Sequence, residues 1–479
     1  MKIAMLSPEI APFAKTGGLA DVAGTLSLAL ERRGHELCLI MPAYRSVFQE
    51  KCKLEATPIK LAVAVADRQV EGLVLRTTIG RNISVYFIHQ QGYFDREALY
   101  GTSQGDYPDN AERYVFFSRA ALEVLRRYPV DIVHCHDWQS SLVTVFLKTQ
   151  PERYRELSTA QSLLTVHNLG FQGLFGETEW PLLNLDRSYF TPRYLEFYGK
   201  INFLKGGLVF AKKVTTVSPS YAEEILEAEQ GFGLDGVLRD RAGDVVGILN
   251  GVDYSQWSPE NDGSIAQRYG ETTLKEGKRV CKKDLQRHLG LPESDVPLLG
   301  MICRLTSQKG IDLVEQIFDQ LMERNVQLVI LGKGEARYEQ FCIGAAGRFP
   351  QQCAARITLD EALAHRIEAG ADIFLMPSRY EPCGLNQMYS LKYGTIPVVR
   401  AVGGLKDTVQ DYDLQTSIGS GFVFGPYHPQ ALLEAIDRAL NVLLDNEAWS
   451  ALQRRAMKMD FSWDRSAQMY SALYQQLLL

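Results

Sequence analysis

The amino-acid sequence predicts an α/β protein made of two doubly wound domains. Short apolar runs alternate with longer amphipathic stretches, which is the pattern of strands followed by helices. This alternation stops near the middle of the chain and then starts again. The length of 479 residues is enough for two α/β domains. The pattern therefore implies largely parallel sheets with helices on both faces.

The first half of the chain begins with a predicted βαβ unit. A strand over 3–6 leads through a loop at Gly17-Gly18 to a helix over 21–33 and a strand over 36–41. Further elements follow. The predicted strands cover 82–88, 131–135, 162–166 and 213–217, and the predicted helices cover 138–148, 201–211 and 220–229.

The second half is set apart by a break at 247–253 and a polar, poorly periodic segment that reaches about residue 275. We therefore expect this segment to be a linker between the two domains. The alternation resumes near 297. The predicted strands cover 297–303, 326–331, 371–376, 396–400 and 422–424, with helices over 311–322 and 335–349 and others between and after the later strands.

Composition and charge exclude several classes of protein. The chain has 51 Lys and Arg against 57 Asp and Glu. It therefore lacks the excess of positive charge that would attract nucleic acids or anionic membranes. No apolar run approaches the length of a transmembrane helix, and Pro8 and Glu9 interrupt the start before a secretory core could form. Eight scattered cysteines without a Cys-x-x-Cys pair fit a reducing compartment. We expect a cytoplasmic protein, or a plastid stromal one if this is a mature plant form.

A pair of cations stands just after a predicted strand. Arg304 and Lys309 lie in the loop between the strand 297–303 and the helix 311–322. Open α/β sheets bind ligands at the carboxyl ends of their strands. A guanidinium can grip phosphate oxygens in two places and a lysine adds a point charge, so the pair could neutralise a departing diphosphate without a metal ion. The alternative is that both are ordinary surface cations.

A carboxylate follows another predicted strand. Glu381 lies between the strand 371–376 and a helix that opens through Gly384. In such a turn a carboxylate can bind sugar hydroxyls or stabilise positive charge on a glycosyl carbon. The alternative for Glu381 is a helix-capping or ion-pairing role. For Cys383 an inert buried thiol is favoured over a nucleophile.

Histidines end two predicted strands of the first half. His134 and His136 share one face of a strand and precede Asp137, which suggests either a metal cluster or hydrogen bonds to a polyol. A metal is disfavoured because no further ligand group stands at a typical spacing. His167, at the end of the strand 162–166, is a candidate for the same crevice or an ordinary core histidine.

A Gly-Gly turn occurs in both halves. The segment 17–22 reads Gly-Gly-Leu-Ala-Asp-Val and the segment 403–408 reads Gly-Gly-Leu-Lys-Asp-Thr, a match short enough to arise by chance. Such a turn lets backbone N–H groups approach an anion at a helix N-terminus. Lys15, beside the first turn, could reach a phosphate or the acceptor side of a cleft. The alternative is that it is an ordinary solvated lysine in a loop. Two weaker patterns, 332–334 and 411–413, are interpreted as an incomplete dinucleotide fingerprint and a solvated turn.

Together these motifs resemble those of one family, the bacterial glycogen synthases and plant starch synthases that use ADP-glucose. The resemblance covers essentially the whole chain. Its motifs are Lys15-Thr16-Gly17-Gly18-Leu19, His136-Asp137-Trp138, His167-Asn168-Leu169, Arg304 with Lys309, and Glu381-Pro382-Cys383-Gly384-Leu385. It implies a GT-B fold, in which two Rossmann-like domains face each other across a deep cleft. The implied parts are an acceptor-side domain over 1–252, a donor-side domain over 253–455 and a C-terminal helix over 456–479 that crosses back to the first domain.

The resemblance also implies an enzyme that transfers glucose from ADP-glucose, with retention, to the non-reducing end of an α-1,4-glucan such as glycogen, starch or a maltooligosaccharide. Arg304 and Lys309 would bind the diphosphate and stabilise its departure. Glu381 would contact the donor glucose, and His167 would lie near the anomeric centre. The other implied donor-site residues are Lys15, Gly18, Asp21, Asp137, Asn168, Cys383, Gly384, Leu385, Gly403 and Gly404. No metal and no cofactor is implied.

Two further points concern the mechanism and the choice of nucleotide. Retention could use a covalent carboxylate, but the family has no settled nucleophile, so a same-face mechanism assisted by the leaving phosphate is preferred. The family often carries an aromatic side chain in the segment 358–361, where it can stack on adenine; this chain has Leu359. The preference for ADP over UDP is therefore open.

Three alternative functions stay open. One is another GT-B transferase with a different nucleotide sugar or a small acceptor, such as a hexose or hexose phosphate. A phosphorylase would need a lysine that holds pyridoxal phosphate, and no motif for one is present. A non-catalytic glucan-binding or priming protein should have lost some site residues, yet Lys15, Arg304, Lys309 and Glu381 are all present. Catalysis is therefore favoured.

Overall fold

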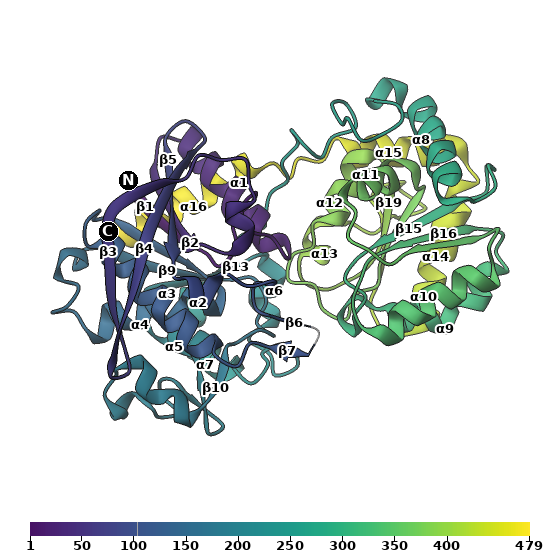
Figure 1. Cartoon of the computed structure of the whole chain (residues 1–479). Helices are drawn as coiled ribbons and strands as arrows, with labels where there is room; N and C mark the ends of the chain where they lie inside the picture. Colours follow the sequence, from purple (N-terminus) through teal and green to yellow (C-terminus); the bar gives the residue numbers. More distant parts are fainter. Residues whose placement is uncertain (103) are drawn as a thin grey trace. The chain divides into compact units, whose positions relative to one another are not determined.

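The structure, a computed structural model, describes residues 1–102 and 104–479. The chain divides into two compact units, and Figure 1 shows both. The first consists of residues 1–251 together with 463–479, and the second of residues 252–462. In the described part of the chain, no helix has the length and apolar character needed to cross a membrane.

The first unit is built on a nine-stranded sheet with the order β14-β13-β9-β8-β1-β2-β5-β4-β3. From β14 to β5 neighbouring strands pair in parallel, and β4 and β3 extend the sheet as an antiparallel edge. The strands are β1 (Lys2–Leu6), β2 (Glu36–Pro42), β3 (Glu55–Val65), β4 (Arg68–Ile79), β5 (Ile83–His89), β8 (Ile132–His136), β9 (Gln161–Val166), β13 (Lys213–Thr216) and β14 (Val245–Gly247).

Smaller strands and helices complete the first unit. The strands are β6 (Gly101–Thr102) with β7 (Gly105–Asp106), and β10 (Leu174–Gly176), β11 (Glu196–Phe197) and β12 (Lys200–Asn202) in the order β10-β12-β11. The helices are α1 (Gly18–Arg32), α2 (Gln91–Phe94), α3 (Asn110–Leu125), α4 (Asp137–Thr149), α5 (Phe203–Phe210), α6 (Pro219–Glu224), α7 (Asp235–Asp240) and α16 (Trp463–Leu478).

The C-terminal helix α16 packs against α1 of the first unit, and Figure 1 draws it in yellow beside that helix. Arg32 on α1 pairs with Asp464 at 3.3 Å, and His35 Nε2 hydrogen-bonds the Ser471 hydroxyl at 2.8 Å. The preceding helix α15 (Asn446–Met457) belongs to the second unit. The sequence placed the start of the C-terminal helix at 456, whereas α16 begins at Trp463.

The second unit has a six-stranded sheet with the order β17-β16-β15-β18-β19-β20, and all neighbouring strands pair in parallel. The strands are β15 (Leu298–Ile302), β16 (Gln327–Leu331), β17 (Cys353–Arg356), β18 (Ile373–Met376), β19 (Ile396–Arg400) and β20 (Phe422–Phe424). The helices are α8 (Leu274–Leu289), α9 (Ile311–Met322), α10 (Ala336–Arg348), α11 (Glu361–Gly370), α12 (Asn386–Tyr393), α13 (Gly403–Thr408), α14 (Pro429–Leu443) and α15. Short 3-10 turns occur in both units: η1 (Arg45–Phe48), η2 (Arg155–Leu157), η3 (Glu177–Leu183), η4 (Arg187–Tyr189), η5 (Ala242–Asp244), η6 (Glu271–Thr273) and η7 (Ser307–Lys309).

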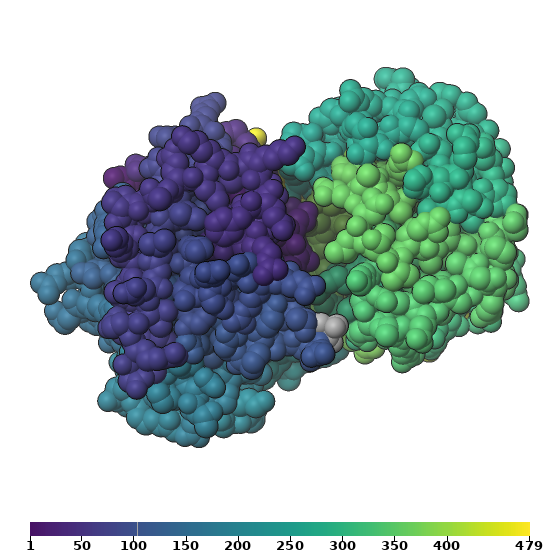
Figure 2. Space-filling view, viewed as in Figure 1, coloured from purple at the N-terminus to yellow at the C-terminus, as the bar shows by residue number. Residues whose placement is uncertain are grey.

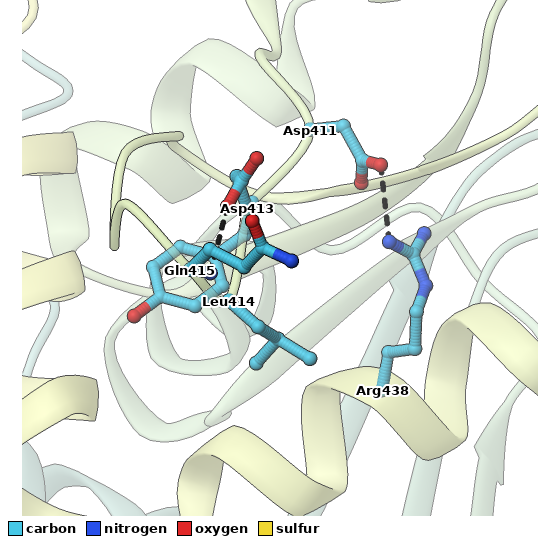
Figure 3. Close-up of a pocket in the computed structure, with 6 residues that line it drawn as sticks. Asp411, Asp413, Leu414, Gln415 and Arg438 are labelled. Atoms are coloured by element: carbon cyan, nitrogen blue, oxygen red, sulfur yellow. Dashed lines mark hydrogen bonds and ion pairs between the residues drawn. The ribbon is translucent and has the colours of Figure 1, made fainter.

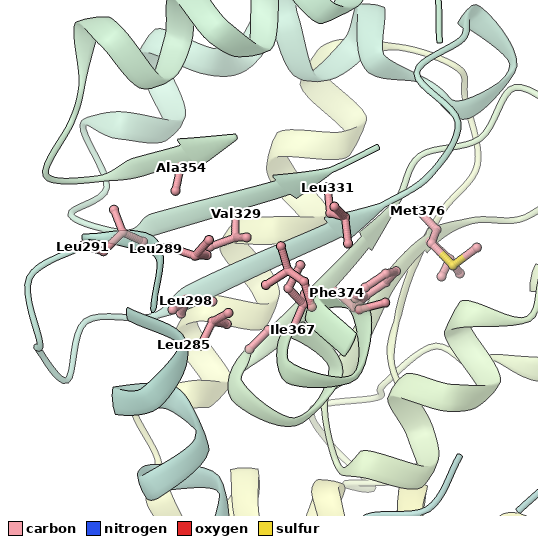
Figure 4. Packing of buried hydrophobic residues seen from close by; sticks show 14 of the residues in the cluster. Leu285, Leu289, Leu291, Leu298, Val329, Leu331, Ala354, Ile367, Phe374 and Met376 are labelled. Atoms are coloured by element: carbon pink, nitrogen blue, oxygen red, sulfur yellow. The ribbon is translucent and has the colours of Figure 1, made fainter. Parts of the chain in front are cut away.

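A core of aliphatic and aromatic side chains fills the space between the second sheet and its helices. Figure 4 shows Val329 and Phe374 from the strands meeting Leu285 and Ile367 from α8 and α11. All four are fully buried. Burial of this apolar surface stabilises the packing of the strands against the helices. The loops at the ends of the strands therefore start from fixed positions.

Both sheets have the strand order of the Rossmann fold. Numbered along the chain, the parallel strands of each unit run 3-2-1-4-5-6, and the first unit adds β14 at one edge. The order reverses between β1 and β8 in the first unit and between β15 and β18 in the second. Ligands of such sheets bind at the carboxyl ends of the strands beside this switch point. The predicted class, two doubly wound α/β domains, is confirmed.

Several elements differ from the sequence prediction. The hairpin β3–β4 and the helix α3 were not predicted. The helix α8, which begins where the predicted linker ends, was not predicted. Its apolar residues are separated by many Lys and Arg residues, so the sequence of the helix is polar on average. The helix predicted over 220–229 is the shorter α6, which begins at Pro219 with Ser218 as its N-cap.

Candidate active site

The loop between β1 and α1 is organised by a buried carboxylate. Glu9 is 4% exposed, and it accepts hydrogen bonds from the Thr16 backbone N–H (2.5 Å), the Thr16 hydroxyl (2.6 Å) and the Tyr100 hydroxyl (2.6 Å). Burial and the charge of Glu9 raise the pKa of Tyr100, so its hydroxyl keeps the proton it donates. Sequence reasoning assigned no role to Glu9. The available signal was an acidic side chain three residues after the end of a buried strand.

The end of this loop and the first turn of α1 carry three of the predicted residues. The Lys15 ammonium lies 2.9 Å from the Asp21 carboxylate, and both side chains are partly exposed. Gly18 is the first residue of α1, and Gly17 before it supplies no capping side chain. The backbone N–H groups of the first turn of α1 therefore lie beside a cation, an arrangement that suits an anionic ligand.

Three imidazoles lie together at the ends of β8 and β9. His136 Nδ1 and His167 Nε2 share a hydrogen bond of 3.0 Å. His134 binds the Tyr474 hydroxyl through Nδ1 (2.8 Å) and the Thr165 hydroxyl through Nε2 (2.6 Å). Burial lowers the pKa of all three histidines, to about 3 for His136. They are neutral at pH 7, and His134 has both ring nitrogens occupied and none left for a metal ion.

Asp137 ties the ends of these two strands together. It begins α4 with a φ of +56°, and its carboxylate accepts the His167 backbone N–H at 2.7 Å. Burial raises the pKa of Asp137 to about 7. The Asn168 side-chain oxygen accepts the Gly170 N–H at 3.0 Å, which closes a turn within the same loop. Both predicted sugar-site residues thus also shape the loop that carries His167.

In the second unit two predicted residues form an ion pair. The Lys309 ammonium lies 2.6 Å from Glu381 Oε2, and the Ser378 hydroxyl donates to the same oxygen at 2.9 Å. Glu381 is 5% exposed. Arg304 lies on the loop that leads from β15 to η7 and Lys309, and its side chain is exposed. The carboxyl ends of β15 and β18, on either side of the switch point, therefore bring a carboxylate and a cation into contact.

The predicted glycines of the second unit allow two loops to touch. Gly384 has a φ of +73° and Gly403 a φ of +42°. The Gly404 N–H donates to the Glu381 carbonyl at 3.1 Å. A Cβ at Gly404 would lie 2.1 Å from the Cys383 carbonyl oxygen, so only glycine fits there. The Gly404 amide thus holds the Glu381 loop, and its contact with a bound donor stays a prediction.

The remaining predicted residues continue this loop. Cys383 is 5% exposed, and Leu385 is the N-cap residue of α12. The Gln387 side chain donates to the carbonyls of Cys383 (3.1 Å) and Gly384 (3.0 Å) and to the Thr408 hydroxyl (3.1 Å). These bonds hold the loop after Glu381 in one conformation. Sequence reasoning did not assign this bracing role to Gln387.

The acidic pattern at 411–413 has a structural role. Asp411 pairs with Arg438 at 3.0 Å and accepts the Val423 N–H at 2.7 Å, while Asp413 accepts the N–H groups of Gln415 and Thr416. Figure 3 shows Asp411, Asp413 and Arg438 beside a surface pocket. Within residues 1–102 and 104–479, no three His, Cys, Asp or Glu side chains are grouped so as to hold a metal ion.

The buried histidines predict how stability depends on pH. His136 has a folded pKa near 3, below the 6.5 of the unfolded chain, so its stabilising effect is present above pH 6.5 and is lost as the pH falls. At pH 5 this loss is about 2 kcal/mol. We expect urea unfolding of His136→Asn to depend less steeply on pH between 5 and 7.5 than that of the unmodified protein.

The exposed His288 on α8 supplies the control. His288→Asn should leave the slope of unfolding free energy against pH unchanged. Asp137, whose raised pKa acts in the opposite direction, is present in both variants and cancels in the comparison. Equal slopes for His136→Asn and the unmodified protein would contradict a neutral His136.

Comparison with known proteins agrees with this architecture. The family model for the starch synthase catalytic domain matches residues 2–240, and that for glycosyl transferases group 1 matches residues 283–456. A glycogen synthase of Koribacter versatilis is 47% identical over 99% of this chain and 98% of its own length. A glycogen synthase of an Anaeromyxobacter species is 49% identical over 100% of this chain and 99% of its own length. The catalytic domain of starch synthase IV from Arabidopsis thaliana, solved with ADP and acarbose, matches with a TM-score of 0.91 at 34% identity over 99% of both chains.

A more distant match, the sucrose-phosphate synthase of Thermosynechococcus elongatus, has a TM-score of 0.59 at 21% identity over 99% of this chain and 98% of its own, and supports the fold alone. The two Rossmann-like units and the cation-carboxylate pair at a switch point define a glycosyltransferase of the GT-B class. The chain belongs to the family of bacterial glycogen synthases and plant starch synthases, and it is a glucosyltransferase.

Proposed function

We propose that this enzyme transfers glucose from ADP-glucose to the non-reducing 4-hydroxyl of an α-1,4-glucan with retention of configuration. The observation that carries the proposal is the contact of Lys309 with the buried Glu381 at 2.6 Å, at the switch point of a Rossmann sheet, with Arg304 on the same loop as Lys309. A diphosphate leaving group needs cations, and a developing glycosyl cation needs a carboxylate. This site supplies both.

The second unit is proposed to bind the diphosphate. Without a ligand, Lys309 is neutralised by Glu381, and an incoming diphosphate would compete for the same ammonium. Arg304, on the same loop, can grip phosphate oxygens in two places. As the bond to the sugar breaks, charge builds on the diphosphate, and the two cations stabilise that charge more strongly than they stabilise the bound donor.

The first unit is proposed to contact the sugar. His167 is held by its hydrogen bond to His136 and by the bond of its backbone to Asp137. Because these imidazoles are neutral, they can exchange hydrogen bonds with hydroxyl groups without placing a cation beside the glycosyl carbon. Lys15 lies on the β1–α1 loop, and Gly18 and Asp21 lie in the first turn of α1. All three are proposed to serve the donor from there.

Retention is proposed to follow the same-face route. The Glu381 carboxylate already accepts bonds from Lys309 and Ser378 through Oε2, which lowers its strength as a nucleophile. The departing phosphate oxygen can take the proton of the acceptor hydroxyl on the face it leaves. Glu381 then stabilises the cationic transition state without bonding to it.

Product analysis tests this proposal against its competitors. With ADP-glucose and maltohexaose, mass spectrometry should show a ladder of longer glucans whose new linkages are cleaved by an α-specific glucosidase. Extension of a hexose or hexose phosphate instead would identify a small-acceptor transferase. Glucan binding without any extension would identify a priming or binding protein. Either result would contradict the proposal.

Leu359 offers a test of nucleotide choice. Its side chain is 81% exposed and precedes α11 by one residue, Asp360. If an aromatic ring here stacks on adenine, Leu359→Tyr should lower the KM for ADP-glucose by about fivefold or more and leave kcat unchanged. Leu444→Tyr, at another exposed leucine of the second unit, should change neither constant. An unchanged KM in Leu359→Tyr would remove this position from the adenine site.

The proposed compartment is the cytoplasm. Cysteines at 38, 52, 135, 281, 303, 342 and 353 form no disulfide within the part of the chain that the structure describes. Burial raises the pKa of several of these thiols, among them Cys38 and Cys303 to about 12, so they are unreactive at neutral pH. Unreactive, unpaired thiols support the proposal of a reducing compartment.

A further inference from the structure

An aromatic residue occupies a turn position that rarely accepts one. Strands β11 and β12 are joined by Tyr198 and Gly199, with Phe197 paired to Lys200, so the hairpin turn has two residues. Both have positive φ, +50° and +77°, the sign that a type I′ turn requires. Asn or Gly is the usual choice at the first position, and a bulky side chain is disfavoured there. Strain of this kind points to function.

The ring of Tyr198 is displayed to solvent rather than packed. The residue is 84% exposed, the highest value of any aromatic residue among the large exposed side chains of the described chain. The Tyr198 ring makes an edge-on contact with the Phe197 ring, at a centroid distance of 4.7 Å. Because the phenol ring is largely exposed, its burial adds little to the stability of the first unit. The stability of the fold therefore does not explain an aromatic residue at this position.

A second turn of the same kind lies against the first. Phe232 has a φ of +47° and Gly233 a φ of +79°. A Cβ at Gly233 would lie 2.9 Å from the Phe197 ring and 3.7 Å from the Tyr198 ring, so the two turns are neighbours. The first unit therefore twice places an aromatic residue in a left-handed conformation before a glycine, at one location.

Hydrogen bonds connect this location to the loop of His167. The Asn202 side chain at the end of β12 donates to Gln172 Oε1 at 2.6 Å, and Gln172 Nε2 donates to the carbonyls of Leu169 (3.2 Å) and Phe232 (3.0 Å). Leu169 follows His167 by two residues. Gln172, Asn202 and Leu169 are buried, so the bracing is rigid. In the space-filling view, blue-to-teal residues of this part of the chain make up the lower end of the first unit (Figure 2).

We propose that Tyr198 is a stacking platform for the acceptor glucan, outside the residues that act on the donor. This inference rests on the proposed function. The C–H faces of glucose units are apolar and pack on aromatic rings, while their hydroxyls stay in water, which suits an exposed phenol with a polar edge. The charged Glu196 and Lys200 flank the turn, so the surroundings favour a polyol over an apolar partner.

The test compares substitutions at Tyr198 in an assay of ADP release from ADP-glucose. Tyr198→Ala should raise the KM for maltohexaose and for glycogen by about tenfold, the scale of one aromatic contact, with kcat and the KM for ADP-glucose unchanged. Tyr198→Phe should keep the KM of the unmodified enzyme. Phe48→Ala, at another exposed aromatic residue of the first unit, is the control and should change nothing.

Tyr198→Asn separates this role from a structural one. Asn-Gly suits a type I′ turn, so this variant should melt at the same or a higher temperature while its KM for glucan rises as in Tyr198→Ala. A lower Tm together with a changed KM for ADP-glucose would mean that Tyr198 is structural and would overturn the inference. So would a KM for glucan within twofold of that of the unmodified enzyme. If the unmodified enzyme released no ADP in response to glucan, the proposed function itself would fail.

Discussion

Replacing Lys309 by alanine is expected to lower kcat for ADP-glucose by at least about tenfold, which corresponds to 1.4 kcal/mol or more in the barrier. The ammonium lies on the loop after β15, 2.6 Å from Glu381, at the place proposed for the diphosphate. Its charge is needed most when the leaving group carries its full negative charge, so the loss should appear in kcat more than in KM. Steady-state rates of ADP release measure both.

Because Glu381 is buried, removing its cation should also lower the free energy of unfolding. A second variant separates the two effects. The double variant Lys309→Ala/Glu381→Gln has no unpaired buried charge. Its free energy of unfolding in urea should therefore be higher than that of Lys309→Ala, while its kcat should stay low. Lys458→Ala, which breaks a surface pair with Glu271, should leave kcat unchanged. A stable Lys309→Ala variant with normal kcat would contradict the role given to this lysine.

Adding one methyl group at Gly404 is expected to damage both folding and activity. A Cβ there would lie 2.1 Å from the Cys383 carbonyl oxygen, and the backbone cannot move away without breaking the bond from the Gly404 N–H to Glu381. Overpacking against backbone costs about 1–3 kcal/mol. Since the displaced loop carries Glu381, Gly404→Ala should also lower kcat by about tenfold. Urea unfolding and ADP release measure the two losses.

Gly347→Ala is the matched control for this variant. Gly347 lies in α10 on an exposed face, with no atom close to the position of a Cβ. Alanine is the better helix former, so the control should keep its activity and gain up to about 1 kcal/mol in stability. If Gly404→Ala kept both properties as well as the control does, the close contact of the two loops would not matter for catalysis.

Much of the fold could be predicted because strand and helix periodicities differ. The first βαβ unit and most of the buried parallel strands were expected close to their observed positions, since continuous apolar runs mark them. The hairpin β3–β4 was missed although the burial of β3 alternates from residue to residue at its C-terminal end. α8 was missed because its few apolar residues, such as Leu285 and Leu289, are separated by charged ones.

The predicted site residues follow strands, which is why sequence could place them on loops at the strand ends. Sequence could not show which loops touch. The pairing of Lys309 with Glu381 spans 72 positions, and the hydrogen bond of His136 to His167 spans 31. It could not show the bracing by Glu9 either, because nothing in a lone acid after a strand says that it turns inward to bind Thr16.

The most direct test of the proposed function is the release of ADP from ADP-glucose with and without glycogen, in the presence of a chelator and with UDP-glucose in parallel. We expect release that requires glycogen and is faster with the ADP donor. It should also survive the chelator, because Arg304 and Lys309 are proposed to supply the positive charge. Preference for UDP-glucose would contradict the donor assignment and direct attention to Leu359. No glycogen-dependent release from either donor would contradict the proposal that this chain extends glucans.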